Sequence, residues 1–515
     1  MNDRETVKNT PVPDSLGKIS IRDAEHAGML PAVEAAGTDA ALLEREEECI
    51  TLALQERPLP KGAMRGRPGA TILAADVGTT GMKMGVFRCE GDSLVLVRQF
   101  TRHYAINTYR NGLFSDIEPE KWQQAFLEGC RGLADLAAEI DVVSLSGTTP
   151  GFTVMDENGS AVIPAILMLD QRSRAQAQRI IETIGLHTLL DATGNMPVAG
   201  GCSLASLLWI RDNLPEAYQR VRTVGHSNTF MARWLTGKAA MDPSSASLTA
   251  LYNTVANDYT WNAEIARAFD IPIACLPEVI PSHESPGCLK EDLSVLTGLT
   301  KRPPVVIGGN DAVLAAYSVG IREPGDTVNV NGTCEITLVC LPRCLPSTRY
   351  NIRAHVIPGR WLTLYVMNAG GKALEWFRSL FCRELDADTF YSDFLSRAVD
   401  AWLDRESGVT YVPFLLGSRY SQEPLKAEFL GITNDTTREE LLAAMVRGLC
   451  EYQREHLRDV AVEVPLSDVI HVTGGAVSDA MIRAKRKWMR DCVYLPEEES
   501  SMKGAAMLGK RYLEG

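Results

Sequence analysis

From residue 71 onwards, short apolar runs alternate with longer segments in which apolar residues recur at every third or fourth position. The short runs have the length and composition of strands, whereas the longer segments have the period of amphipathic helices. This alternation predicts an α/β fold in which helices cover the sheets. The predicted strands are 71–76, 82–87, 94–100, 141–147, 152–156, 303–309, 327–332, 335–340, 361–366 and 468–475, and clear helical segments cover 119–140 and 437–457.

One arrangement of strand, Gly-Thr turn and strand occurs twice. The first copy has the turn Gly78-Thr79-Thr80-Gly81, and the second, with Gly332 and Thr333 in its turn, starts about 250 residues later. We therefore expect two similar domains, over 71–322 and 323–515, each opening with such a hairpin.

Residues 1–70 differ from the rest of the chain. The first 30 residues are polar without a clear period, 40–55 could form one amphipathic helix, and 57–70 hold three prolines, three glycines and four basic residues. This composition is typical of a linker. We expect a disordered or loosely docked extension, and a regulatory or oligomerising arm is the alternative.

The composition excludes several classes of partner. The net charge of −13 argues against nucleic acids and anionic membranes, because nothing would neutralise their phosphates over a wide surface. No apolar run reaches the roughly 18 residues of a membrane span, and the N-terminus lacks the apolar region of a secretory signal. The twelve cysteines form no CxxC pair, which favours reduced thiols in a cytoplasmic protein.

The first hairpin carries a candidate phosphate site. Glycines at both ends of its turn permit close backbone approach, so that Thr79, Thr80 and nearby N–H groups could point at phosphate oxygens, and Lys83 could add a charge. Asp76, at the end of the first strand, could bind Mg2+ through water. The alternative is a plain β-hairpin with a stabilising glycine turn.

A second carboxylate follows the strand 303–309. Asp311 lies after a Gly-Gly-Asn turn and starts an apolar helical segment, so the helix dipole would keep it ionised. An ionised carboxylate at the mouth of a cleft can accept a hydroxyl proton. The alternative is an ordinary helix-capping aspartate. Further glycine pairs at 370–371 and 474–475 could let a base or ribose lie against bare backbone, although each pair alone is a weak signal.

Taken in order, these motifs resemble those of one family. The segments DVGTTG, SDIEPEKW, MLDQRS, DPSSASLTALYN, GGND, NGTCEI, AGGKALEW, TGGAVSD and KGAAMLG are similar to those of the FGGY carbohydrate kinases. The resemblance covers residues 71 to about 513. It implies two ribonuclease H-like domains of the actin–hexokinase–heat-shock chaperone superfamily, an interdomain cleft, and phosphorylation of a sugar or polyol by ATP.

The resemblance also implies a role for individual residues. Asp311 is the general base, and Asp76 helps to hold Mg2+ close to it, so that both carboxylates belong to the metal environment. The nucleotide-binding residues are Thr79, Thr80 and Lys83 near the γ-phosphate, Gly332 and Thr333 in the second hairpin, and Gly371, Gly475 and Asp479 in the nucleotide pocket.

The sugar pocket departs from the family pattern. Thr149 and Pro150, in SGTTPG, stand where xylulokinases carry a Met-His pair, and the Arg-Glu pair of glycerol kinases is also missing. We therefore expect a neutral ketose or polyol as the acceptor. Asp170 and Arg172 match a family pattern near the cleft, but taken in isolation they could form a surface salt bridge of little energetic value.

Other interpretations stay open at this stage. A non-catalytic relative that senses sugar and nucleotide is one alternative, and an actin-like or chaperone-like ATPase with a protein partner is another. A homodimer is compatible with the sequence. His226 lacks the Asp or Ser partners of a catalytic base, and Trp122 is expected to pack against the first helix rather than to stack on a sugar.

Overall fold

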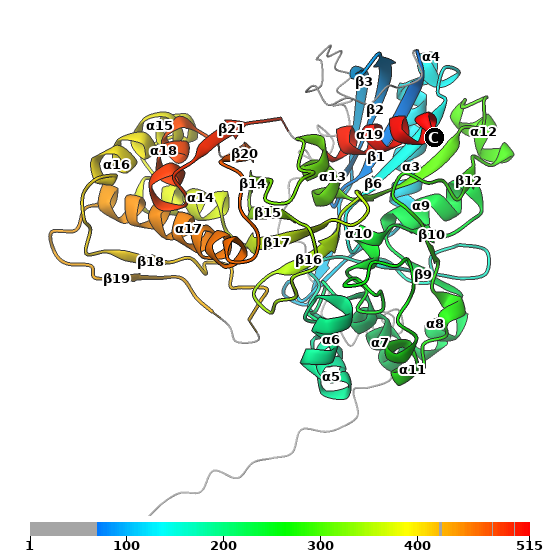
Figure 1. Cartoon of the computed structure of the whole chain (residues 1–515), viewed down its shortest axis with the longest axis horizontal. Helices are drawn as coiled ribbons and strands as arrows, with labels where there is room; N and C mark the ends of the chain where they lie inside the picture. Colours follow the sequence, from blue (N-terminus) through cyan, green and yellow to red (C-terminus); the bar gives the residue numbers. More distant parts are fainter. Residues whose placement is uncertain (1–68, 422–424, 476, 499) are drawn as a thin grey trace, which may run out of the picture.

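The computed structural model describes residues 69–515 except 422–424, 476 and 499. The helical segment expected at 40–55 and the linker up to residue 68 lie outside the described residues. Figure 1 shows two halves, each built around a sheet. Within the described part of the chain, no helix is long and apolar enough to cross a bilayer.

The first sheet holds six strands in the order β12-β13-β6-β1-β2-β3. The hairpin of β1 and β2 is antiparallel and β3 continues it, whereas β6 and then β13 add in parallel on the other side. The strands are β1 (Thr71–Val77), β2 (Gly81–Glu90), β3 (Ser93–His103), β6 (Val142–Gly147), β12 (Gly287–Cys288) and β13 (Pro304–Asn310).

The second sheet repeats this plan in the order β16-β17-β15-β14-β20-β21. Its opening hairpin of β14 and β15 is antiparallel, β17 continues it, and β20 and β21 add in parallel beside β14. The expectation of two similar α/β halves is therefore confirmed. The strands are β14 (Thr327–Asn331), β15 (Glu335–Leu341), β16 (Asn351–Ala354), β17 (Trp361–Met367), β20 (Val469–Thr473) and β21 (Val493–Pro496).

Helices and short strands cover both sheets. In the first half they are β4 (Asn107–Tyr109), β5 (Phe114–Ile117), α3 (Glu120–Gly132), α4 (Ala134–Ala137), β7 (Thr153–Met155), β8 (Ala165–Ile166), α5 (Arg174–Ile184), α6 (Leu186–Thr193), α7 (Ser203–Asn213), α8 (Pro215–Arg220), β9 (Thr223–Gly225), α9 (Ser227–Thr236), β10 (Ala240–Met241), α10 (Pro243–Ala246), α11 (Ala263–Ala268), η1 (Ile273–Cys275), β11 (Glu278–Val279), α12 (Glu291–Thr297) and α13 (Asp311–Ser318). Later in the chain they are α14 (Gly371–Phe381), α15 (Ala387–Thr389), η2 (Phe390–Phe394), α16 (Leu395–Trp402), β18 (Thr410–Val412), β19 (Glu428–Leu430), α17 (Arg438–Ala461), α18 (Asp479–Trp488) and α19 (Ser501–Glu514).

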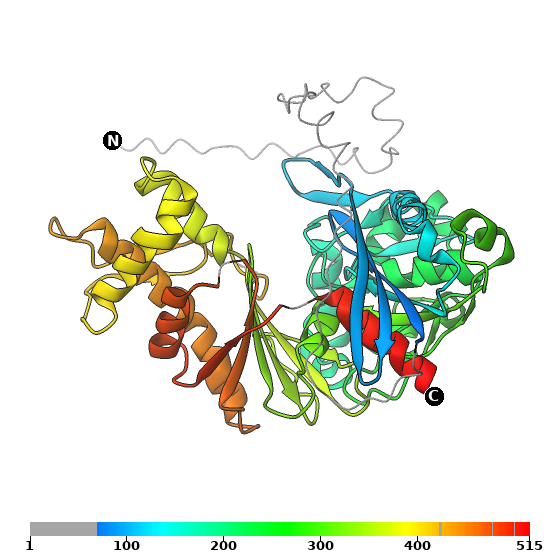
Figure 2. The same ribbon diagram turned by 90° about the horizontal axis from the view of Figure 1, so that it is seen from above.

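The last helix, α19, returns to the first sheet. It packs against β1, β6 and α13, and Figure 2 shows it lying across the strands of the first hairpin. Two glycines permit this close approach, because a Cβ on Gly504 would lie 2.2 Å from the carbonyl oxygen of Leu314 and one on Gly509 would lie 2.9 Å from Ile72. One apolar cluster joins α13 and α19 to strands of both sheets. Our proposed division at residue 322 assigns α19 to the C-terminal domain by sequence, although α19 packs on the sheet of the N-terminal one.

Several predicted elements differ in detail. The helical segment 119–140 breaks at Leu133, whose side chain is buried and whose backbone leaves the helical region. The segment 437–457 forms α17, which runs on to Ala461, and the hydroxyl of Thr437 caps it by accepting a hydrogen bond from the N–H of Glu440. Strands β16 and β21 were missed because each is only four residues long, which is too short for an apolar pattern to stand out.

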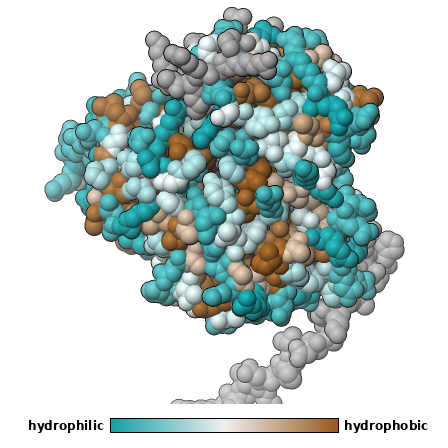
Figure 3. Space-filling model, turned by 45° about the vertical axis from the view of Figure 1, so that its right-hand side comes forward, coloured by the Kyte–Doolittle hydropathy of each residue, from teal (hydrophilic) through white to brown (hydrophobic). Residues whose placement is uncertain are grey.

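The surface agrees with the acidic, polar composition. On the face drawn in Figure 3, apolar residues lie in separate patches among polar ones. All cysteines among the described residues are free thiols, and most of them are buried.

Candidate active site

The carboxyl ends of β1, β6 and β13 form one edge of the first sheet. The strand register places Asp76 beside Ser146 and Ser146 beside Gly309, and the next row pairs Gly147 with Asn310. The chain leaves these three strands into the turn after β1, the segment 148–151 and α13 respectively. Parallel strands are about 4.8 Å apart. The turn after β1, the segment 148–151 and the start of α13 are far apart in the sequence, but they therefore lie close together in space.

Asp76 is buried at this edge and points toward β6. Its Oδ1 accepts a hydrogen bond from the Ser146 hydroxyl at 2.6 Å. Tyr104 donates from its own hydroxyl to the carbonyl of Gly78 at 2.7 Å, and burial together with the Asp76 charge raises the pKa of Tyr104. Lys83 lies directly opposite Asp76 in the hairpin register, with an exposed side chain, so both project from the same face of the hairpin.

The turn after β1 has the tight geometry that its glycines suggest. The N–H of Gly78 donates to the carbonyl of Gly81 at 2.9 Å, and a Cβ on Gly78 would lie 2.8 Å from that oxygen. Thr79 lies within 3.0 Å of Thr148 between their hydroxyl oxygens, whereas Thr80 is exposed. The turn therefore presents hydroxyl and N–H groups beside the segment that follows β6.

Asp311 is the first residue of α13, as expected, and is half-buried. Asn310 caps the helix, because its Oδ1 accepts a hydrogen bond from the N–H of Val313, and its own N–H donates to the hydroxyl of Ser244. That hydroxyl in turn donates to the buried carboxylate of Asp242, whose pKa burial raises. The backbone before Asp311 is thus held by the segment 242–253, which carries the DPSSASLTALYN motif. The sequence alone did not connect this motif with Asp311.

The second hairpin is bonded to the start of α14. The N–H groups of Gly370 and Lys372 donate to the carbonyl of Thr333, at 3.0 and 3.2 Å, and the N–H of Gly371 donates to the carbonyl of Gly332 at 2.9 Å. Thr333 is exposed. These contacts bring Gly332, Thr333 and Gly371 together.

The turn after β20 lies beside the second hairpin. Val330 of β14 pairs with Thr473, and Gly474 adopts a φ of +98° with its Cα close to the carbonyl of Asn331. Gly475 is exposed, and so is Asp479, which starts α18. The predicted nucleotide residues of the second half therefore lie at one edge of the second sheet, whereas Thr79, Thr80 and Lys83 lie on the hairpin of the first sheet.

Thr149 and Pro150 follow β6 directly and are joined by a cis peptide bond. Thr149 is buried, and its hydroxyl donates to the carbonyl of Gly147 at 3.1 Å. Trp122 is fully buried, packs edge-on against Phe230 and underlies this segment. Its role is therefore packing, as expected.

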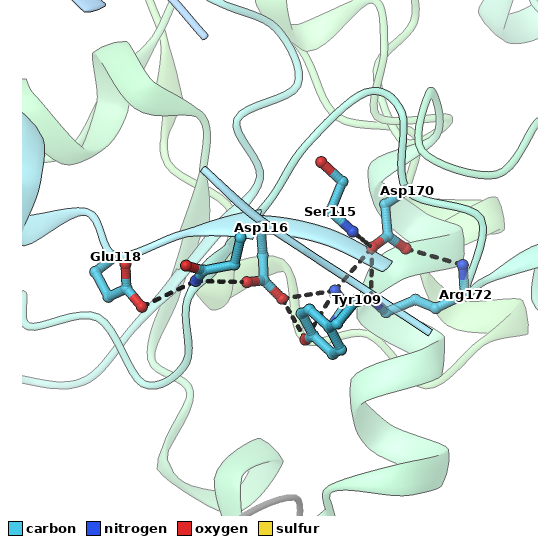
Figure 4. A network of polar contacts seen from close by, with 7 residues as sticks. Tyr109, Ser115, Asp116, Glu118, Asp170 and Arg172 are labelled. Carbon is cyan, nitrogen blue, oxygen red and sulfur yellow. Dashed lines mark hydrogen bonds and ion pairs between the residues drawn. The ribbon is translucent and has the colours of Figure 1, made fainter. Parts of the chain in front are cut away.

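Asp170 and Arg172 belong to a buried polar network (Figure 4). Arg172 bridges Asp170 and Asp116, with ion-pair distances of 2.7 Å to each, and its side chain is 3 % exposed. Its guanidinium also lies 4.3 Å above the ring of Phe114. The carboxylate of Asp116 accepts further hydrogen bonds from Tyr109 and Asn107. The surface salt bridge considered from the sequence is wrong, because both charges lie in the interior.

His226 is buried rather than placed at the site edge. Its Nε2 lies 2.7 Å from the hydroxyl of Ser203, and its ring packs edge-on against Phe152. Burial, aided by the charge of Arg353, lowers its pKa to about 3, so the ring is neutral at physiological pH.

Sequence analysis missed two groups of charged residues near these segments. Arg353 is buried on β16, and its only signal in the sequence is a basic residue between the apolar residues Ile352 and Ala354. Glu335 and Lys485 form a buried ion pair beneath the second hairpin, and Asn329 donates to the same carboxylate oxygen at 3.0 Å. Glu335 follows the Gly-Thr turn at once, whereas the spacing to Lys485 gives no indication of contact.

The arrangement fits Mg2+ held mainly by a nucleotide. Among the described residues, no group of three or more His, Cys, Asp or Glu side chains could hold a metal by itself. Mg2+ commonly keeps several waters and uses one or two carboxylates together with substrate phosphates. Asp76, a single carboxylate beside a hydroxyl-rich turn, suits that type of site.

Comparison with known proteins shows the fold and the family of the chain. The chain is 25 % identical over 447 residues to the xylulose kinase of Staphylococcus xylosus, covering 85 % of this chain and 90 % of that relative. A ligand-bound xylulose kinase from Lactobacillus acidophilus has the same fold, with a TM-score of 0.78, 18 % identity, and coverage of 86 % of this chain and 89 % of that one. A gluconate kinase from the same organism has a TM-score of 0.77 and 20 % identity at the same coverage.

Two family matches cover most of the described chain. Residues 71–318 match the N-terminal domain of the FGGY family of carbohydrate kinases, and residues 327–511 match its C-terminal domain. The expected pair of actin-like ATPase domains is thereby confirmed. The chain therefore belongs to the FGGY family of carbohydrate kinases.

Proposed function

We propose that this carbohydrate kinase transfers the γ-phosphoryl group of ATP to one hydroxyl of a neutral ketose or polyol, with Asp311 as the general base. The observation that carries this proposal is the meeting of Asp76, the 78–81 turn and Asp311 at one edge of the first sheet. Phosphoryl transfer depends mainly on positioning and charge neutralisation, and this edge offers groups for both.

The two hairpins would hold the phosphates of ATP from the two halves. Thr79 and Thr80 would donate hydroxyl and backbone hydrogen bonds on one side, and Gly332 and Thr333 would do so on the other, while Lys83 adds a positive charge. Gly371, Gly475 and Asp479 would line the nucleoside pocket. Asp76, with Asp311 nearby, would hold Mg2+, which neutralises phosphate charge when it is bound.

Asp311 would take the proton of the attacking hydroxyl. Its position at the start of α13 favours the ionised carboxylate, because the helix dipole is positive at that end. The cap by Asn310 and the bond from Asn310 to Ser244 hold the backbone of this residue in place. A proton acceptor with a fixed backbone needs little reorganisation when the acceptor hydroxyl arrives. Closure of the two halves would exclude water, which competes as a nucleophile.

The acceptor pocket would lie beside Thr149 and Pro150. Neither residue carries a charge, so this segment favours a neutral acceptor over an acid or a phosphorylated sugar. Asp170 and Arg172 would contribute to the acceptor pocket indirectly, by fixing the segment on which they lie. Arg172 is already bonded to two carboxylates.

A panel assay tests this function. ADP release by the full chain is measured with Mg2+ and ATP against ketoses, polyols, aldonic acids and sugar phosphates. We expect the highest kcat/KM with a neutral ketose or polyol. A sugar acid or sugar phosphate as the best acceptor would contradict the neutral-acceptor assignment. Tight sugar binding without ADP release for any member would contradict the kinase activity of this site and favour a sensor.

A further inference from the structure

Strand β16 belongs to the second sheet, yet its free edge is hydrogen-bonded to the first half. The N–H of Ile352 donates to Oδ1 of Asn195 at 2.8 Å, and Nδ2 of Asn195 donates back to the carbonyl of Ile352 at 3.0 Å. The N–H of Ala354 donates to the hydroxyl of Ser247 at 3.0 Å. Arg353 lies between these two contacts. It is therefore held where the two halves of the kinase meet.

The guanidinium of Arg353 is buried with most of its donors unused. The residue is 2 % exposed, and its one hydrogen bond among the described residues runs from Nη1 to the carbonyl of Ile352 at 2.9 Å. Among the described residues, its Nε has no hydrogen-bond partner, and no carboxylate lies within ion-pair distance of the guanidinium. Keeping an unpaired charge in the interior opposes folding, because the charge loses its hydration without gaining a partner.

Helix α10 links Arg353 to the proposed base, because α10 contacts both β16 and β13, the strand that ends just before Asp311. The charge of Asp311 acts on Arg353, and the charge of Arg353 lowers the pKa of His226. His226 packs against Phe152, two residues after Pro150. Arg353 therefore lies within electrostatic reach of both the proposed base and the core beneath the 149–150 segment.

Burial without a paired carboxylate has a measurable cost for this residue. Burial is the main cause that lowers the pKa of the Arg353 guanidinium to about 9; the nearby charge of Arg419 acts in the same direction, whereas Tyr420 and Asp311 oppose it. At pH 7 the group stays charged. A ligand with acceptor oxygens would complete the hydrogen bonds of this cation.

We propose that Arg353 is a specificity-determining residue of the acceptor site, whose guanidinium donates to two neighbouring oxygen atoms of the sugar. This inference rests on the proposed function and names the contact that selects the acceptor. The planar fork of an arginine suits two adjacent oxygens, such as a carbonyl with its neighbouring hydroxyl or two vicinal hydroxyls. Asp311 would then accept the proton of the reacting hydroxyl while Arg353 orients the atoms beside it.

The charge balance of the pocket agrees with a neutral acceptor. The positive charge of Arg353 and the negative charge of Asp311 offset each other across the site. A carboxylate on the acceptor would gain from Arg353 but would also approach Asp311, which opposes it.

The test combines two variants with one acceptor and its deoxy analogues. Kinetics of the full chain are measured for wild type, Arg353→Met and Arg353→Lys with the best acceptor and with its deoxy analogues. We expect Arg353→Met to lower kcat/KM for the acceptor about 100-fold, the loss expected for two charge-assisted hydrogen bonds. The kcat/KM of Arg353→Lys, which keeps the charge but not the planar fork, should lie between those of wild type and Arg353→Met. The KM for ATP should stay within about twofold, because the two hairpins that would hold its phosphates do not include Arg353.

The deoxy analogues separate a direct contact from a structural role. For wild type, kcat/KM should be much lower with one deoxy analogue than with the best acceptor. For Arg353→Met, the same analogue and the best acceptor should give similar kcat/KM values, because the variant has already lost the contact to the missing oxygen. Equal losses for every analogue in both proteins would overturn the proposal, and so would a matching rise in the KM for ATP. Arg349→Met is the matched control, because Arg349 precedes the same strand, is half exposed and pairs with Asp459. It should leave all these parameters unchanged.

The same variants distinguish failure of this inference from failure of the proposed function. If wild type releases no ADP with any acceptor, the kinase proposal fails, and calorimetric titration of the sugars still tests Arg353. Weaker binding to Arg353→Met than to wild type would then support the contact, and equal binding would overturn it. An aldonic acid that is preferred by wild type and not by Arg353→Met would keep the contact but contradict the neutral acceptor.

Discussion

Ser146 on β6 donates its hydroxyl hydrogen to the carboxylate of Asp76 on β1, across two neighbouring parallel strands and at 2.6 Å. The bond is buried and fixes one oxygen of Asp76, leaving the other for a different partner. In metal sites, such hydrogen bonds orient the ligand and contribute to affinity. The relationship therefore links a residue of β6, which sequence analysis did not select, to the proposed Mg2+ site.

Replacing Ser146 by alanine should weaken the use of Mg2+ by the kinase. Loss of the hydrogen bond frees the Asp76 carboxylate to rotate, so we expect the Mg2+ concentration for half-maximal rate to rise about tenfold. Asp76→Asn should raise it further and also lower kcat. The measurement is initial rate against Mg2+ at fixed ATP and acceptor. Ser144→Ala is the matched control, since Ser144 lies two residues earlier on the same strand, is buried and has no hydrogen-bond partner for its hydroxyl among the described residues. Equal Mg2+ dependence in wild type and Ser146→Ala would contradict the assignment of Asp76.

The buried pair of Glu335 and Lys485 should be costly to break from one side only. Lys485→Met leaves a buried carboxylate with Asn329 as its remaining hydrogen-bond donor, so we expect the free energy of unfolding to fall by about 3–5 kcal/mol. The double variant Glu335→Gln, Lys485→Met should recover most of this loss, because no charge remains buried. Urea unfolding of the three proteins gives the comparison. The pair also joins the second hairpin to α18, so the KM for ATP should rise in the single variant. A double variant as unstable as the single one would show that the charge is not the cause.

Acid should destabilise the protein through buried histidines. Burial lowers the pKa of His226 and of His456 to about 3, from an unfolded value near 6.5. Below pH 6.5 the unfolded chain binds protons that the native rings do not, so stability falls as the pH drops from 6.5 towards 3. Each ring should lower the free energy of unfolding by about 2 kcal/mol between pH 7 and pH 5, because one pH unit of differential proton binding corresponds to about 1.36 kcal/mol.

A single variant checks this pH dependence. His456 lies 2.9 Å from the hydroxyl of Thr363 and stacks on Tyr365. His456→Gln should be less stable than wild type at pH 7, and the difference should shrink by about 2 kcal/mol at pH 5, as measured by urea unfolding. His187→Gln, at an exposed position, should show no such change. A constant difference for His456→Gln at both pH values would contradict a neutral buried ring.

Local pattern was sufficient to predict most of the fold. The runs that form β1, β2, β14 and β15 are long, apolar and bounded by glycine turns, and the repeat of this hairpin is enough to indicate two similar halves. Short strands such as β16 were missed because four residues with a central arginine resemble a loop. The return of α19 to the first sheet is a long-range contact that depends on small residues at 504 and 509, and no local signal records it.

The site was predictable only where its residues follow a strand or start a helix. Asp76, Thr79 and Asp311 stand at such positions, and the strand order brings them together. Arg353 could not be predicted in the same way, because β16 is a very short strand and its position depends on hydrogen bonds to Asn195 and Ser247, which are far away in the sequence. Arg172 was predicted to lie near the cleft, but its burial follows from packing against Phe114 and Trp209.

The most direct test of the account is the steady-state kinetics of Asp311→Asn with the best acceptor. We expect kcat to fall by roughly 10²–10⁴, the usual contribution of a general base, at a nearly unchanged KM for ATP, because the two hairpins still hold the phosphates. Circular dichroism checks the fold, and Glu291→Gln, an exposed carboxylate at the first residue of α12, serves as the control. A kcat above about a tenth of the wild-type value for Asp311→Asn would contradict the account, because another residue would then have to take the proton.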